Sequence, residues 1–147
     1  LFTLGFAFQK GLIPLLEGPI ARAIKSVDRD RIFVAIAGSE IVTAAGKEGL
    51  RIAEEAFCDR TYDDNGRITS RKFPNALIRD PEQAVRQVVS FITEQALITK
   101  SGRKIPTEIR TFCTHGDEPT GVDVAGAVLQ ALEKNGVRVV PLPELTF

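Results

Sequence analysis

The residues best suited to chemistry lie in one short stretch, Cys113-Thr114-His115-Gly116-Asp117-Glu118-Pro119. His115 is the only histidine of the chain. Asp117 would act as a base, orient His115 or bind a cation, and Gly116 would allow a tight turn or the close approach of a ligand. A histidine and an aspartate also occur in solvated surface turns, so the stretch alone leaves chemistry and structure open.

A second group of polar residues lies in the charged segment 58–72. Long loops inside compact domains are often functional. The candidate ligand-contacting residues here are Asp59, Arg60, Tyr62 and Arg71. The alternative is a solvated connection whose surface ion pairs contribute little to stability.

The elements that position these groups follow from hydrophobic patterning. The continuous apolar run at 32–37 is typical of a strand covered on both faces, as in parallel sheets. Further strands are predicted at 50–57 and 108–114, and helices at 17–27, 39–47, 80–96 and 120–134. Strands alternating with helices favour βα units and a largely parallel sheet. We therefore expect loops 38–39, 58–72 and 114–119 at one end of the molecule.

Smaller signals refine this picture. Asp80-Pro81 predicts a helix start, with aspartate at the N-cap and proline at the first position. Thr120 and Asp123 have the spacing of a capping box, the segment 97–105 predicts a hairpin, and 137–142 predicts a short strand. The predicted buried face of the last helix consists of Val122, Ala125, Leu129 and Leu132. The chain contains no Walker phosphate-binding motif.

Composition bounds the class of protein. With 147 residues, 44% hydrophobic and 26% charged, the chain suits a single soluble domain over 1–147. Nineteen basic and nineteen acidic residues cancel, which argues against a nucleic-acid partner. Two cysteines form neither a disulfide framework nor a zinc motif, so a reducing, cytoplasmic compartment is expected, with a single disulfide left open.

The start of the chain has its own features. The sequence contains no methionine, so we expect the chain to be processed, excerpted or incomplete. The apolar segment 1–16 is too short to span a bilayer and lacks the pattern of a signal peptide. It is predicted to be a strand or a buried segment, and no membrane association is expected.

Four motifs in consistent order resemble the C-terminal part of the LamB/YcsF family, the A subunits of ATP-hydrolysing 5-oxoprolinases. They are Ala37-Gly38-Ser39-Glu40, then Glu55-Ala56-Phe57-Cys58-Asp59-Arg60-Thr61-Tyr62, then Ser70-Arg71 with Pro74-Asn75-Ala76 and Asp80-Pro81, and finally the stretch 113–119. The likeness runs from about residue 30 to 142, and residues 1–29 match poorly. Cys58 and Asn75 stand where the family usually has alanine and glycine.

This resemblance implies an α/β fold with mostly parallel strands, as part of a seven-stranded β/α barrel of the TIM-like, glycoside hydrolase/deacetylase class. It also implies cleavage of the lactam of 5-oxo-L-proline to L-glutamate with ATP as cofactor, and 5-oxoprolinase subunits B and C as partners. Metal dependence and a homo-oligomer stay open. In this interpretation His115, Asp117 and Asp59 are catalytic, with His115 and Asp117 as the acid/base pair. Substrate binding falls to Glu55, Arg60, Tyr62, Arg71 and Gly116, with Arg60 or Arg71 holding carboxylate or phosphate.

Several motifs of the family are absent from this sequence: its N-terminal acidic motif, C-G-x-H-A-G-D, H-P-G and K-P-H-G-A-L-Y. Half a barrel would leave sheet edges and an apolar interior uncovered, which favours association or instability. Two alternatives therefore stand beside the enzyme. One is a truncated, non-catalytic homologue or interaction fragment. The other is a metal-dependent deacetylase-like hydrolase with His115 and Asp117 as ligands, for which one histidine is thin support.

Overall fold

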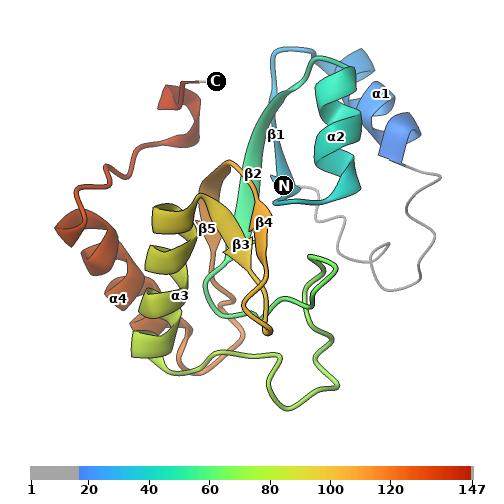
Figure 1. Ribbon diagram of the computed structural model, residues 1–147. Helices are drawn as coiled ribbons and strands as arrows, with labels where there is room; N and C mark the ends of the chain where they lie inside the picture. Colours follow the sequence, from blue (N-terminus) through green and yellow to red (C-terminus); the bar gives the residue numbers. More distant parts are fainter. Residues whose placement is uncertain (1–16, 147) are drawn as a thin grey trace.

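The computed structural model describes residues 17–146, in which helices and strands alternate along most of the chain (Figure 1). The elements in order are α1 (Glu17–Val27), β1 (Ile32–Ile36), α2 (Glu40–Lys47), β2 (Arg51–Phe57), α3 (Pro81–Glu94), β3 (Ala96–Ile98), β4 (Lys104–Pro106), β5 (Ile109–Cys113), α4 (Gly121–Lys134) and the 3₁₀ helix η3 (Leu142–Glu144). The predicted α/β class is confirmed. The strand or buried segment predicted at 1–16 lies outside the described residues.

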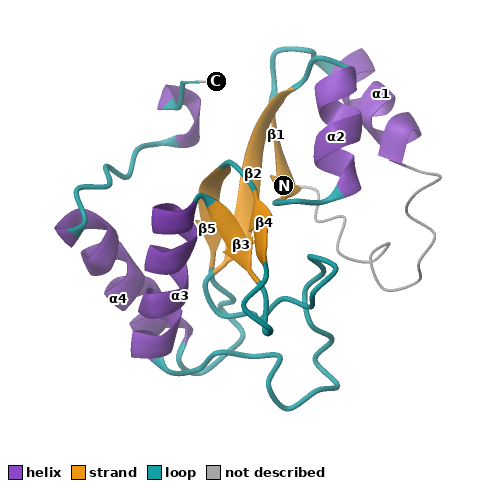
Figure 2. Cartoon of the chain, in the orientation of Figure 1, coloured by secondary structure: helices purple, strands orange, loops and turns teal. Residues whose placement is uncertain are grey.

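A three-stranded parallel sheet in the order β1-β2-β5 forms the centre of the molecule. Each crossover between these strands contains a helix that returns the chain to the starting edge, as parallel pairing requires. The carboxyl ends of all three strands therefore share one edge, where the long loops gather (Figure 2). Both the parallel sheet and the common position of the three loops were predicted correctly.

The strands β3 and β4 form a separate antiparallel hairpin, which confirms the prediction for 97–105. Its turn contains Gly102 at a φ of 85°, a conformation that favours glycine.

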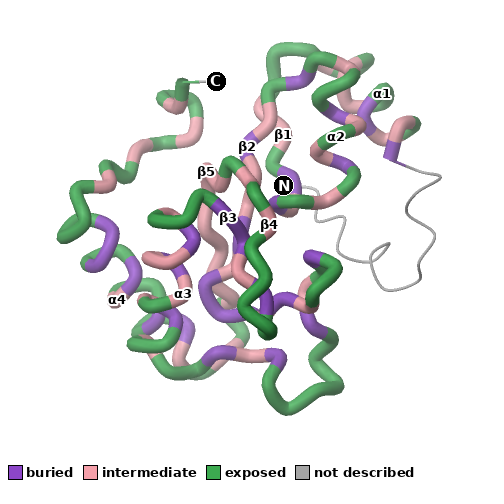
Figure 3. Tube along the Cα trace, viewed as in Figure 1, coloured by how far each residue is buried: buried purple, intermediate pink, exposed green. Residues whose placement is uncertain are grey.

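Two helix pairs flank the sheet. Ala21 of α1 and Ala45 of α2 are buried in one apolar cluster, against which Phe33 of β1 and Ile52 of β2 pack. The other pair, α3 and α4, lies side by side (Figure 1) and buries Val88, Val124 and Val128 around Cys58. Buried and exposed positions are interleaved along both of these helices (Figure 3). Each fully buried valine contributes about 2 kcal/mol.

The buried face of α4 differs from the predicted one. Val122 and Leu129 are 85% and 45% exposed, whereas Val124, Val128 and Ala131 are buried together with Leu132. The helix carries apolar residues around most of its circumference, so two different stripes satisfy helical spacing. Packing against α3 selects one of them.

Two local predictions about the C-terminal part of the chain are wrong: the capping box at Thr120 and the strand at 137–142. Thr120 stands at the N-cap of α4, but its side chain makes no capping hydrogen bond. Asp80, in contrast, accepts hydrogen bonds from the backbone N–H groups of Glu82 and Gln83, as predicted. The segment 137–142 has no strand pairing and ends in η3. An apolar run becomes a strand only where a neighbouring strand edge pairs with it.

Within residues 17–146, no strand pairs with the outer edge of β1 or of β5. The described strands thus form open sheets, and a seven-stranded barrel stays a prediction about a longer chain. In this described part of the chain, no helix is long and apolar enough to cross a membrane.

Candidate functional site

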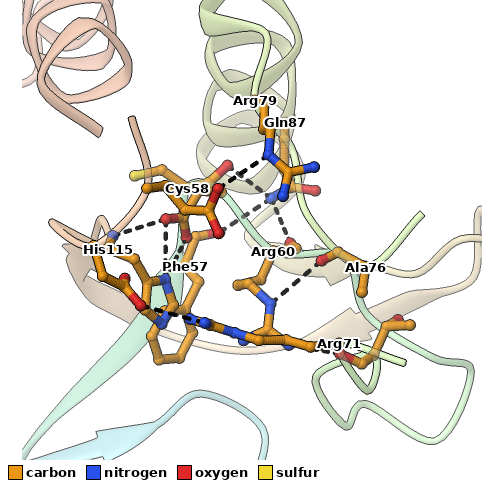
Figure 4. A network of polar contacts seen from close by, with 12 residues as sticks. Phe57, Cys58, Arg60, Arg71, Ala76, Arg79, Gln87 and His115 are labelled. Atoms are coloured by element: carbon orange, nitrogen blue, oxygen red, sulfur yellow. Dashed lines mark hydrogen bonds and ion pairs between the residues drawn. The ribbon is translucent and has the colours of Figure 1, made fainter. Parts of the chain in front are cut away.

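The candidate site lies at the carboxyl edge of the sheet, where the loops after β2 and β5 meet (Figure 4). The last register pair of these two strands is Phe57 and Cys113. Asp59 and His115 each follow two residues later, so the parallel register brings them to the same level. This geometry explains why side chains 56 positions apart come into contact.

Asp59 holds His115 at two points. One carboxylate oxygen, Oδ2, accepts the backbone N–H of His115 at 2.7 Å, and the ring nitrogen Nδ1 lies 2.9 Å from Oδ1. An ionised carboxylate only accepts hydrogen bonds, so in the neutral ring Nδ1 carries the hydrogen and Nε2 keeps its lone pair. Asp59 is 3% exposed, and this buried contact leaves Nε2 as the basic nitrogen.

Phe57 fixes the plane of the imidazole. Its ring stacks on that of His115 with centroids 5.2 Å apart and an interplanar angle of 17°. Together with the two contacts to Asp59, the stacking leaves the ring little freedom. A fixed ring orientation of this kind is what a histidine needs in order to act as a general base.

A second pair lies beside the first. Arg71 Nη1 donates to Asp117 Oδ2 at 3.3 Å, and both side chains are exposed. The hydrogen bond from Arg71 lowers the pKa of Asp117, with His115 adding a small effect of the same sign. In the structure His115 thus contacts Asp59, and Asp117 contacts Arg71; that His115 and Asp117 act as an acid/base pair stays a prediction.

Glu55 lies on β2 opposite Thr111 of β5. Partial burial raises the pKa of its carboxyl, while the Thr111 hydroxyl and the nearby His115 oppose the rise. A carboxyl held toward its neutral form can donate a hydrogen bond to a carbonyl or carboxylate oxygen. Glu55 thus adds to this site a carboxyl group whose pKa is raised, whereas the pKa of Asp117 is lowered.

Arg60 and Tyr62 lie behind this site instead of lining it. Arg60 is 8% exposed, and its guanidinium donates to the carbonyl oxygens of Ala76 and Thr69. The Tyr62 hydroxyl accepts the backbone N–H of Phe57 at 2.8 Å, and its ring is 1% exposed. These contacts of Arg60 and Tyr62 are with the backbone of their own loop.

The glycine that this loop requires is Gly121, which was not among the predicted site residues. A Cβ on Gly116 would meet no atom within 4 Å, whereas one on Gly121 would lie 2.5 Å from the carbonyl oxygen of His115. Gly121 begins α4, so its missing side chain lets the helix start directly against the His115 loop. In the sequence Gly121 only follows a predicted helix start, and nothing there indicates that it packs against His115.

Gln87 is a second residue that sequence patterns do not reveal. It comes from α3, and its amide nitrogen lies within hydrogen-bonding distance of three carbonyl oxygens beside Asp59 (Figure 4). In the sequence, Gln87 is one of several polar residues in a predicted helix, and nothing distinguishes it from the others.

Neither cysteine of the described residues forms a disulfide. Burial raises the pKa of Cys58 and of Cys113 to about 11 each, which keeps both as neutral thiols near pH 7. Among residues 17–146, no group of three or more histidine, cysteine, aspartate or glutamate side chains has the arrangement of a metal site. The metal-dependent alternative thus gains no geometric support from this part of the chain.

Comparison with known proteins places these features in a family. The model of the LamB/YcsF family matches residues 15–147, a wider span than the 30–142 recognised from motifs. The chain is 43% identical over 122 residues to the A subunit of 5-oxoprolinase from Rhodopseudomonas palustris strain BisB5, covering 83% of this chain and 48% of that protein. It is 38% identical over 132 residues to the corresponding A subunit from Coprothermobacter proteolyticus, covering 90% and 49%.

A solved structure agrees with the sequence relatives. The lactam utilization protein from Thermus thermophilus superposes with a TM-score of 0.71 at 34% identity, over 84% of this chain and 49% of that one. The chain therefore spans about half the length of the relatives it matches.

Proposed function

Because this chain belongs to the LamB/YcsF family, we propose that it contributes the His115 side of the active site of an ATP-dependent 5-oxoprolinase, which opens the lactam of 5-oxo-L-proline to L-glutamate. Relatives named as the A subunit of 5-oxoprolinase support the proposal. The single observation in the structure that carries it is the contact between Asp59 and His115 Nδ1.

We infer the base from that contact. With Nδ1 bound to Asp59, Nε2 of His115 takes a proton from a water molecule while the water oxygen bonds to the lactam carbonyl carbon. The C–N bond then breaks, and the same proton passes to the leaving amine. A base preorganised in this way contributes about 10²–10⁴-fold to a rate.

Arg71 is the proposed partner of the substrate carboxylate. Its guanidinium is exposed beside His115 and presents the fork that matches a carboxylate. Asp117 holds this side chain toward the site until substrate competes for it. Glu55 would offer its carboxyl group to the same substrate as a hydrogen-bonding partner. Arg60, Tyr62 and Gly116 are proposed to act on the loop backbone.

ATP fits the described residues only in part. Arg71 suits one phosphoryl group, but residues 17–146 contain no phosphate-binding loop of the Walker type. ATP supplies activation of the lactam carbonyl when it is bound. We propose that the other contacts to ATP come from the rest of a family-length protein and from 5-oxoprolinase subunits B and C.

The proposed setting is a seven-stranded β/α barrel of which this chain forms about half. Unpaired outer edges on β1 and β5 among the described residues suit such a continuation. The same open edges suit the second candidate, a non-catalytic fragment that associates with other subunits.

A chimera separates these two candidates. Residues 17–146 replace the matching half of the Rhodopseudomonas palustris relative, and cleavage of 5-oxoproline is assayed with subunits B and C and ATP. We expect activity that His115→Gln abolishes, with Asp123→Asn, an exposed change on α4, as the matched control. An active chimera unaffected by His115→Gln removes His115 from the mechanism. An inactive chimera beside an active parent favours the non-catalytic fragment.

A further inference from the structure

We propose that Gln87 is a positioning residue that holds Asp59, and through it His115, in the geometry of the site. The inference rests on the proposed function of the same site. Gln87 Nε2 lies 3.0, 3.3 and 2.9 Å from the carbonyl oxygens of Phe57, Cys58 and Arg60. These three carbonyls lie on both sides of Asp59 in the chain.

The contacts matter because β2 ends at this point. The carbonyls that follow a strand lose their ladder partners, and a buried carbonyl without a partner costs free energy. Among the four consecutive carbonyls 57–60, that of Asp59 accepts the backbone N–H of Ile78 at 2.9 Å. The other three lie within 3.3 Å of the Gln87 amide nitrogen, whose two N–H groups can bond two of them fully and share the third.

Gln87 itself is held firmly. Its neighbours on α3, Ala84, Val88 and Phe91, are all buried, and Asp80 caps the first turn of the helix. The side chain is partly buried between the helix and the loop. The amide therefore connects a rigid helix to the backbone that carries Asp59.

Only a donor of the right length can do this. Methionine has the size and flexibility of glutamine but donates no hydrogen bond, so Gln87→Met leaves the three carbonyls unpaired. The turn would then relax and move the Asp59 carboxylate away from its two contacts with His115. A misplacement of about 1 Å at a catalytic group lowers rates by as much as 10²-fold.

The first readout needs no turnover. Because His115 is the only histidine, the ¹⁵N spectrum of its ring reports one tautomer equilibrium directly. In the unmodified chain at a pH where the ring is neutral, we expect the pattern of a hydrogen on Nδ1. Gln87→Met should shift this pattern toward a mixture of tautomers. The matched control is Gln83→Met, an exposed position one turn earlier on the same helix.

The second readout is activity of the chimera defined above. We expect Gln87→Met to lower kcat by about 10-fold to 100-fold with a much smaller change in KM, and Gln83→Met to change neither. If Gln87→Met does not fold, Gln87→Asn keeps the amide on a shorter side chain and should give a smaller change of the same kind.

The outcomes are separable. A folded Gln87→Met or Gln87→Asn variant with an unchanged ring pattern overturns the positioning role, even if its melting temperature falls. A changed ring pattern in the chain itself, beside a chimera that never cleaves 5-oxoproline, supports the positioning role and counts against the proposed function.

Discussion

The carboxylate of Asp59 accepts both the backbone N–H and the ring Nδ1–H of His115, at 2.7 and 2.9 Å. Hydrogen bonds to the backbone nitrogen and to the ring nitrogen of one residue together define the position and the tautomer of the imidazole. The exposed pair Arg71 and Asp117 lies on the same loops but has no such constraint.

Asp59→Asn should therefore reverse the tautomer of His115. An asparagine side chain offers one acceptor and one donor group. Its oxygen must stay with the backbone N–H of His115, so its NH₂ faces Nδ1 and moves the hydrogen to Nε2. Activity in the chimera should fall, with the roughly 10⁴-fold loss caused by the equivalent change in a serine protease as an upper bound. The ¹⁵N spectrum of the single histidine checks the tautomer, and Asp123→Asn should leave it unchanged.

Arg71→Gln should weaken substrate binding more than turnover. A hydrogen bond to a charged group contributes about 1.5–3 kcal/mol, which corresponds to a KM for 5-oxoproline raised about 10-fold to 100-fold. Steady-state kinetics of the chimera measure both constants. Arg67→Gln removes an exposed charge from the same loop and serves as control. A fall in kcat with KM unchanged would assign Arg71 a role in the transition state instead.

Glu55→Gln should stabilise the protein near neutral pH. Burial raises the pKa of this carboxyl above its unfolded value. A group of this kind contributes stability below the unfolded pKa and loses that contribution as pH rises through the folded pKa. The neutral glutamine avoids the loss, so its gain in melting temperature should be largest near pH 7 and vanish below about pH 4. Melting curves across this range test the sign, with Glu133→Gln on the exposed face of α4 as control. A gain that does not depend on pH would point to packing.

Gly121→Ala and Gly126→Ala should have opposite effects although both glycines lie on α4. A Cβ on Gly121 would come within 2.5 Å of the His115 carbonyl oxygen, whereas one on Gly126 would meet nothing within 4 Å. Crowding of this kind costs about 1–3 kcal/mol, and alanine in an open helix position gains about 0.5–1 kcal/mol over glycine. Urea unfolding of the two variants compares the free energies of unfolding. Equal stability would show that the α4 start moves away from the His115 loop without cost.

Much of the architecture follows from local patterns. The apolar run at 32–37 and the Asp80-Pro81 start have local physical causes, strand burial and helix capping, and the structure confirms both. Predictions were wrong where local patterns allow more than one outcome. The apolar surface of α4 admits two buried stripes, and the run at 137–142 needs a neighbouring strand that the described residues do not supply.

By itself, the sequence determined that chemical groups follow β2 and β5 and share one edge of a parallel sheet. Only the tertiary structure decided which of them meet. Between Glu54 and Glu55 the register of β2 against β5 shifts, and it resumes so that Phe57 lies opposite Cys113. That register, a long-range property of two paired backbones, sets Asp59 against His115 and leaves Asp117 to Arg71. A shift of one residue would turn each side chain to the opposite face of the sheet.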